Sequence, residues 1–140
     1  MNPFIEPRYW YIHILERQER LALLKARLDP HAKPTDSIRV QSGSIGSILE
    51  DVSIEIQETQ EEIARFENEY AAARIRLKKI LQQRENLTAS LIIEMHDLDL
   101  MEWSDIGKKL SLSTRQLQRL RNEEAERLGY PLKEEGQENR

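Results

Sequence analysis

The chain has 140 residues, 33% of them charged and 39% hydrophobic, and this composition is typical of one or two small helical domains. It contains no cysteine, which excludes disulfide bridges and thiolate metal sites and agrees with a cytoplasmic location. No stretch approaches the roughly 20 apolar residues of a membrane-spanning helix, and no targeting segment is visible, so we expect no membrane contact.

The first predicted element is an amphipathic helix over residues 7–28. Its apolar side chains recur at helical spacing, which places them on one face: Trp10, Ile14, Leu21, Leu24 and Leu28. Residues 29–44 follow as a polar loop that contains Pro30, Pro34 and Gly43.

A second, much longer helix is predicted from Ser47, where Ser47 and Glu50 have the spacing of a capping box. No Pro or Gly occurs between residues 47 and 85. An unbroken alternation of four and three residues marks its apolar stripe, which Leu87 and Leu91 extend: Leu49, Val52, Ile56, Thr59, Ile63, Phe66, Tyr70, Ala73, Leu77 and Ile80.

The first helix is too short to bury the whole apolar stripe of this long helix. At 1.5 Å per residue it would be about 60 Å long, and the first helix, at about 33 Å, would fold back over only half of it. Ile54, Ile75 and Leu81 widen the apolar surface beyond the main stripe. We therefore expect a homo-oligomer, with a dimer favoured and the stoichiometry open.

Residues 103–128 have the apolar spacing of a helix-turn-helix. Five side chains would form one small core between two short helices: Ile106, Leu110, Leu112, Leu117 and Leu120. Gly107 falls where the helices approach most closely, and Ser113 with Gln116 forms a capping box for the second helix. Gly129 and Pro131 predict the end of that helix.

The opposite face of the second helix carries residue types that bind DNA. Arg115, Gln118 and Arg119 suit base edges or adjacent phosphates, Thr114 suits a phosphate, and Asn122 suits adenine. Lys108 and Lys109 on the preceding helix would help to position the backbone. The alternative is that this face has no binding role and is simply exposed to solvent, because Arg and Gln form helices well at any exposed position.

Charge is distributed unevenly along the chain, whose net charge is −4. Residues 103–122 have five cations against Asp105, which gives +4, whereas residues 50–70 have eight acids against Arg65, which gives −7. A local basic face can meet double-stranded DNA, while the acidic segments oppose nonspecific binding.

Enzymatic and metal-binding interpretations are weak. His13, His31 and His96 are scattered, and the group His96, Asp97 and Asp99 is more simply a polar helix end than a metal site. The segment at residues 43–46 has two glycines but neither a preceding strand nor a Lys, so it predicts a turn into the long helix rather than a phosphate loop. We expect no catalysis and no cofactor.

Residues 91–128 resemble the sigma-70 region 4 type of helix-turn-helix found in small phage-encoded regulators, with ArpU/RinA-like late-gene regulators the most similar. The positions that carry the resemblance are Trp103, Ile106, Leu110, Ser113, Arg115, Leu117 and Leu120. Upstream, Ser44-Ile-Gly46 and the long helix resemble the same proteins loosely. The resemblance implies activation of phage late genes in a bacterial host cell, and contact with host RNA polymerase.

The chain departs from that pattern at two places. Leu100, Met101 and Glu102 stand where the pattern often has Gly-Leu-Ser, and Ser111 replaces a frequent turn Gly or Asn. The first change removes a flexible turn and a good N-cap, and the second alters the turn between the two helices.

The predicted architecture is all-α, with a helical assembly module at residues 1–86, a DNA-binding helix-turn-helix at 87–130 and a disordered acidic tail at 131–140. Two other functions stay open. One is a small terminase-like packaging protein, and the other is a coiled-coil interaction protein that does not bind DNA.

Overall fold

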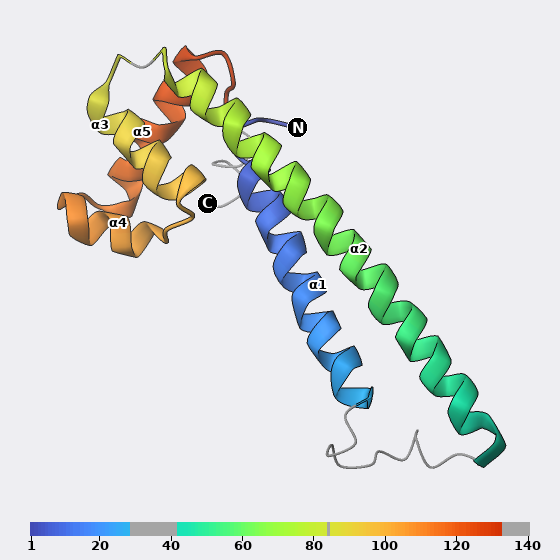
Figure 1. Ribbon diagram of the computed structural model, residues 1–140. Helices are drawn as coiled ribbons and strands as arrows, with labels where there is room; N and C mark the ends of the chain where they lie inside the picture. Colours follow the sequence, from blue (N-terminus) through green and yellow to red (C-terminus); the bar gives the residue numbers. More distant parts are fainter. Residues whose placement is uncertain (29–41, 84, 133–140) are drawn as a thin grey trace. The chain divides into compact units, whose positions relative to one another are not determined.

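The computed structural model describes residues 1–28, 42–83 and 85–132, and within that part it is all-helical (Figure 1). An N-terminal helix packs on a long helix, and short helices follow. The elements are α1 (Glu6–Leu28), α2 (Ser42–Leu81), α3 (Leu87–Ile93), a π-helical turn η2 (Glu94–Leu98), α4 (Trp103–Leu110) and α5 (Thr114–Arg127). Of the predicted loop at residues 29–44, residues 29–41 lie outside the described residues, as does the tail after Leu132, whereas residues 42–44 belong to α2.

The long helix begins earlier and ends earlier than the sequence pattern predicted. α2 starts at Ser42, so the segment at residues 43–46 is helical rather than a turn, and Ser47 lies inside the helix instead of capping it. α2 ends at Leu81, and Asn86 starts a separate helix, because its side chain accepts a hydrogen bond of 3.0 Å from the backbone N–H of Ala89.

The predicted extension of the stripe to Leu87 and Leu91 was therefore wrong. Both side chains belong to α3 and are exposed, by 72% and 43% respectively. Leu81 was expected to widen an open apolar surface, but it is buried in a core cluster with Phe4 and Leu77. Ile54 and Ile75, by contrast, stay about half exposed.

Contacts divide the chain into two compact units. The hairpin unit is Tyr11–Asn68, and the C-terminal unit is Met1–Trp10 together with Glu69–Arg140. The last turns of α2 and the first residues of the chain are thus grouped with the short helices. The modules expected at residues 1–86, 87–130 and 131–140 stay a prediction.

In the hairpin unit, α1 lies alongside α2 (Figure 1). Ile14 and Leu24 of α1 and Val52 of α2 are buried, as the spacing predicted. Thr59 is buried in the same stripe, and its hydroxyl donates a hydrogen bond of 2.7 Å to the carbonyl oxygen of Glu55 one turn earlier. A polar residue thereby occupies a core position without an unsatisfied group.

Partly exposed charges also join the two helices of the hairpin. Arg20 Nη2 lies 2.9 Å from Glu55 Oε2, and Arg17 Nε lies 3.4 Å from Glu62 Oε2. Such pairs contribute little to stability, about 0–1 kcal/mol each. The hairpin therefore depends mainly on its narrow apolar seam.

The C-terminal unit has two apolar clusters. The first joins the start of the chain, the end of α2, α3, η2 and α5, through Phe4, Leu77, Leu81, Ile93, Leu98, Ala125 and Leu132. The second joins α3 and η2 to α4 and α5, through Ile92, Met95, Ile106 and Leu117. The N-terminal residues take part in this unit because Asn2 Nδ2 donates to the carbonyl oxygens of Tyr130 and Pro131, each at 3.2 Å.

Within the described part of the chain, no helix has the length and apolar character needed to cross a membrane.

Candidate nucleic-acid interface

A three-residue connection sets the geometry between α4 and α5. Ser111 ends α4 in the left-handed conformation, with φ of 58°, and its N–H donates to the carbonyl oxygen of Gly107. Ser113 then caps α5: its hydroxyl accepts from the N–H of Gln116 at 3.2 Å, while Gln116 Oε1 accepts from the N–H of Ser113 at 2.9 Å. The predicted capping box is confirmed, and it fixes the first turn of α5.

Gly107 marks the close approach that the sequence indicated. A Cβ at this position would lie 2.8 Å from the carbonyl oxygen of Leu112 and 3.7 Å from Leu117 Cδ1. Backbone cannot give way as the end of a side chain can, so only glycine fits without a shift. The predicted small core is also confirmed, because Ile106 and Leu117 are buried and the remaining apolar positions pack on them: Met101, Trp103, Leu110, Leu112 and Leu120.

A buried ion pair attaches α5 to η2. Arg121 Nη2 and Nε donate to the two oxygens of Asp97, at 2.8 and 3.0 Å, and these residues are only 8% and 1% exposed. His96 Nδ1 lies 2.8 Å from Asp97 Oδ1, and the His96 ring stacks on Trp103 with centroids 3.7 Å apart. Arg121 is held in this buried pair, so it cannot also contact DNA.

Two sequence interpretations change at this pair. Arg121 was counted among the basic residues of the segment, but only Lys108, Lys109, Arg115 and Arg119 remain as exposed cations. His96, Asp97 and Asp99 do lie at the end of a helix, since η2 ends at Leu98 with Asp99 as its C-cap, but His96 and Asp97 are buried while Asp99 is exposed. Among the described residues, no group of three or more His, Asp or Glu side chains is placed to hold a metal ion.

The position of Arg121 along α5 indicates that its side chain is buried, and this was not recognised from the sequence. Arg121 follows the buried Leu117 by four residues and precedes the buried Ala125 by four, so it shares their face of α5. A charged residue in that phase needs a buried partner of opposite charge. The preceding segment has three acidic candidates, Glu94, Asp97 and Asp99, and the structure pairs Asp97 with Arg121.

The predicted DNA-contacting residues of α5 share one exposed face. Thr114, Arg115, Gln118 and Arg119 are exposed and Asn122 is half-buried, while Leu117 on the other side is fully buried. The structure thus brings these five positions together on one helix. Lys108 and Lys109 are exposed in the last turn of α4, on the other side of the connection.

One acidic side chain lies beside this face. Arg119 Nε is 3.7 Å from Glu123 Oε1, and both side chains are 65% exposed. A pair of this kind is weak, so Arg119 can exchange the carboxylate for a phosphate or a guanine edge at little cost.

The two positions that depart from the phage regulator pattern have the same backbone property. Leu100 has φ of 59° and Ser111 has φ of 58°, and these are the non-glycine residues with positive φ in the described chain. Glycine or asparagine adopts this conformation more readily. Glu102, which replaces the expected good N-cap, makes no side-chain capping bond to α4.

A second ion pair anchors the far end of α5. Arg127 Nη2 and Nε donate to Glu124 at 2.7 and 2.9 Å, and Arg127 Nη2 also donates to the carbonyl oxygen of Gln83 at 3.1 Å. The hydrogen bond from Arg127 lowers the pKa of Glu124, and the backbone N–H groups of Glu85 and Asn86 act in the same direction, against the opposing effect of burial. α5 is thereby tied to the connection that precedes α3.

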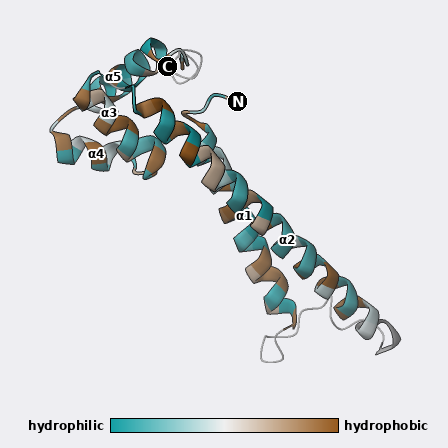
Figure 2. Cartoon of the chain, turned by 45° about the horizontal axis from the view of Figure 1, so that its top comes forward, coloured by the Kyte–Doolittle hydropathy of each residue, from teal (hydrophilic) through white to brown (hydrophobic). Residues whose placement is uncertain are grey.

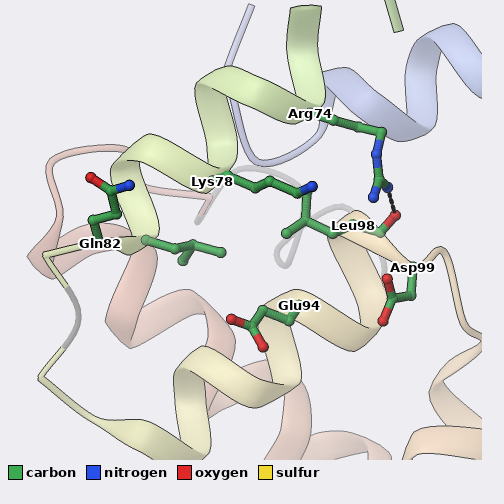
Figure 3. Close-up of a pocket in the computed structure, with 7 residues that line it drawn as sticks. Arg74, Lys78, Gln82, Glu94, Leu98 and Asp99 are labelled. Atoms are coloured by element: carbon green, nitrogen blue, oxygen red, sulfur yellow. Dashed lines mark hydrogen bonds between the residues drawn. The ribbon is translucent and has the colours of Figure 1, made fainter. Parts of the chain in front are cut away.

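A separate cleft of about 560 Å³ lies in the C-terminal unit (Figure 3). Arg74 donates to the carbonyl oxygen of Leu98 across it, and Lys78 faces a rim that also carries Glu94 and Asp99. Cations and carboxylates occur in equal number, so the cleft has no net charge with which to select a ligand class. It is a weaker candidate than the exposed face of α5.

No protein-family model, curated protein or solved structure matches this chain. The resemblance to phage regulators therefore stays a prediction.

Proposed function

We propose that the chain is a sequence-specific DNA-binding transcriptional regulator that inserts α5 into the major groove. One observation carries the proposal: α5 presents Arg115, Gln118 and Arg119 on one exposed face while its opposite face is fixed by Gly107, the capping box and the Arg121–Asp97 pair. A helix held this rigidly can present a constant pattern of donors to base edges.

The roles of the side chains follow from their chemistry. Arg115 and Arg119 donate in fork geometry to guanine or phosphate, and Gln118 pairs with adenine. Thr114 lies in the first turn of α5 and Lys108 and Lys109 lie in the last turn of α4, where they suit phosphate contacts that set the register. Asn122, half-buried and one turn after Gln118 on the same face, completes the site.

The biological context rests on the resemblance alone. It favours activation of phage or prophage late genes in the cytoplasm of a bacterial host, with host RNA polymerase as a further partner. Pairing of two chains would place two half-sites about 34 Å apart or at a multiple of that distance.

Selection of bound sequences from a random DNA pool near physiological salt tests the proposal. We expect an enriched motif with the wild type and its loss with Arg115→Ala/Arg119→Ala, since each lost base contact costs about 1–3 kcal/mol. The matched control, Lys25→Ala/Arg27→Ala, removes the same charge from exposed positions of α1 and should keep the motif. Absence of enrichment, or a motif that survives the α5 double substitution, would overturn the proposal.

A further inference from the structure

The exposed charges of α5 change sign along the helix. The first two turns carry Arg115 and Arg119, whereas the last two turns carry the exposed acids Glu123 and Glu126. Figure 2 shows α5 mostly in the hydrophilic colour. At 100° per residue the four positions fall within an arc of about 80°, so the cations and the acids share one face. A helix that presents this face to DNA therefore brings carboxylates close to phosphates together with its guanidinium groups.

Glu123 is the acid that contacts one of these arginines. It follows Arg119 by one turn, and its Oε1 lies 3.7 Å from Arg119 Nε, which is the separation of an ion pair rather than of a hydrogen bond. The nearest approach is at Nε. The two Nη groups at the end of the exposed guanidinium therefore stay available as the fork that fits guanine O6 and N7.

Stabilisation of the helix explains this pair poorly. An ion pair four residues apart supports a helix best when the acid precedes the cation, and here Arg119 precedes Glu123. An acid in the second half of a helix also gains nothing from the helix dipole, which favours cations there. The neighbouring Glu124 is compensated by two hydrogen bonds from Arg127, whereas the contact of Glu123 with Arg119 is long and exposed.

We propose that Glu123 is a specificity-determining residue of the DNA-binding face, because it makes Arg119 select the edge of a guanine over a phosphate. The inference rests on the proposed function and adds to it the base that Arg119 reads.

The two alternative ligands of Arg119 differ in charge. Arg119 leaves the ion pair at little cost, but Glu123 stays about 6 Å further along the same helix. A phosphate bound by Arg119 is then repelled by this carboxylate, which lies within the screening length of about 8 Å at physiological salt. Guanine O6 and N7 are neutral acceptors, so the carboxylate does not oppose that contact and helps to hold the guanidinium in place.

Arg115 lacks this restraint. The positions three and four residues after it on α5 hold Gln118 and Arg119, so no carboxylate follows it at the spacing of a helical neighbour. Arg115 can therefore bind a phosphate as readily as a base. We expect Arg119 to contribute more than Arg115 to discrimination between sequences, and less to the salt dependence of binding.

The affinity of the full chain for its selected site and for random-sequence duplexes, measured at several salt concentrations, tests the inference. Glu123→Gln keeps the size of the side chain and removes its charge. We expect tighter binding to random DNA, a salt dependence steeper by about one phosphate contact, and a ratio of specific to random affinity that is lower by about tenfold. The control Glu126→Gln removes the same charge from an exposed position seven residues after Arg119 and should leave the ratio unchanged.

Single base-pair changes in the selected site locate the effect. Arg119→Ala should lose discrimination at one G·C pair, and Glu123→Gln should lose it at that pair alone. In the Arg119→Ala background, Glu123→Gln should not lower the ratio further, because the two residues act together. Circular dichroism checks that each variant keeps its helix content.

The outcomes separate this inference from the proposed function. If the wild type selects a motif but Glu123→Gln keeps the affinity ratio, or lowers it no more than Glu126→Gln does, the inference is overturned and the proposed function stands. An A·T pair at the position that Arg119 reads also overturns it. A wild type that selects no motif overturns both.

Discussion

The α4–α5 region and the hairpin unit are both made of two helices, yet different interactions define them. In the α4–α5 region, specific local contacts set the geometry: the Cβ-free approach at Gly107, the reciprocal cap at Ser113 and the buried Arg121–Asp97 pair. In the hairpin, repeated apolar spacing and partly exposed ion pairs hold the helices together.

This difference bears on what each region is suited to do. A helix pair held by specific local contacts is what the proposed recognition of a base sequence requires. The hairpin depends instead on a narrow apolar seam and partly exposed ion pairs, which tolerate substitution more readily. Substitutions that are chemically alike should therefore have unequal effects in the two regions.

The largest contrast is expected between two arginines that pair with carboxylates. Arg121→Met leaves the carboxylate of Asp97 buried without its main partner, and we expect a loss of about 3–5 kcal/mol in the free energy of unfolding. Arg17→Met removes a hairpin pair of 3.4 Å whose side chains are 31% and 33% exposed, and should cost about 0–1 kcal/mol. Urea denaturation followed by circular dichroism measures both, and equal losses would contradict the comparison.

The next contrast compares two Gly→Ala substitutions, which we expect to change the free energy of unfolding in opposite directions. Gly107→Ala brings a Cβ within 2.8 Å of a backbone oxygen and should destabilise by about 1–3 kcal/mol. Gly46→Ala in α2 meets nothing within 4 Å, and alanine is the better helix former, so we expect a gain of about 0.5–1 kcal/mol.

Thermal unfolding of the Gly46→Ala and Gly107→Ala variants beside the wild type measures both changes in stability in one experiment. A neutral Gly107→Ala would mean that the turn can move away from α4, and the rigid geometry argued for this region would be wrong.

Sequence patterns predicted the α4–α5 region closely, because its signals are local. The capping box, the glycine approach and the apolar core each involve residues within a few turns of one another, so spacing alone specifies them. The exposed face of α5 followed from the same periodicity.

The wrong predictions arose where two local sequence signals compete, or where a contact joins residues far apart in the chain. Periodicity continued through Leu87, but Asn86 offers an N-cap that starts a new helix, and a local cap prevailed over a continuing stripe. The burial of Leu81 depends on Phe4, 77 positions away in the chain, and no pattern along the sequence indicates that contact. The Arg121–Asp97 pair was missed in part for this reason: the phase of Arg121 along α5 indicates its burial, but nothing along the sequence identifies Asp97, 24 residues earlier, as its partner.

The smallest expected effect concerns the acid response of the C-terminal unit. Arg127 holds the pKa of Glu124 below its ordinary value of 4.5, so the ionised carboxylate stabilises the folded state above about pH 4.5. That contribution is lost as the pH falls through the lower folded-state pKa. Glu124→Gln should therefore lower the free energy of unfolding near pH 7, and its difference from the wild type should shrink towards pH 3.

Urea denaturation at a series of pH values measures this difference. Glu62→Gln is the matched control, because Glu62 pairs with Arg17 in the hairpin, where a third of each side chain is exposed and the pair contributes little. A Glu124→Gln curve parallel to that of the wild type at every pH would show that the bidentate contact does not stabilise α5. The far end of α5 would then depend on packing alone, as the hairpin seam does.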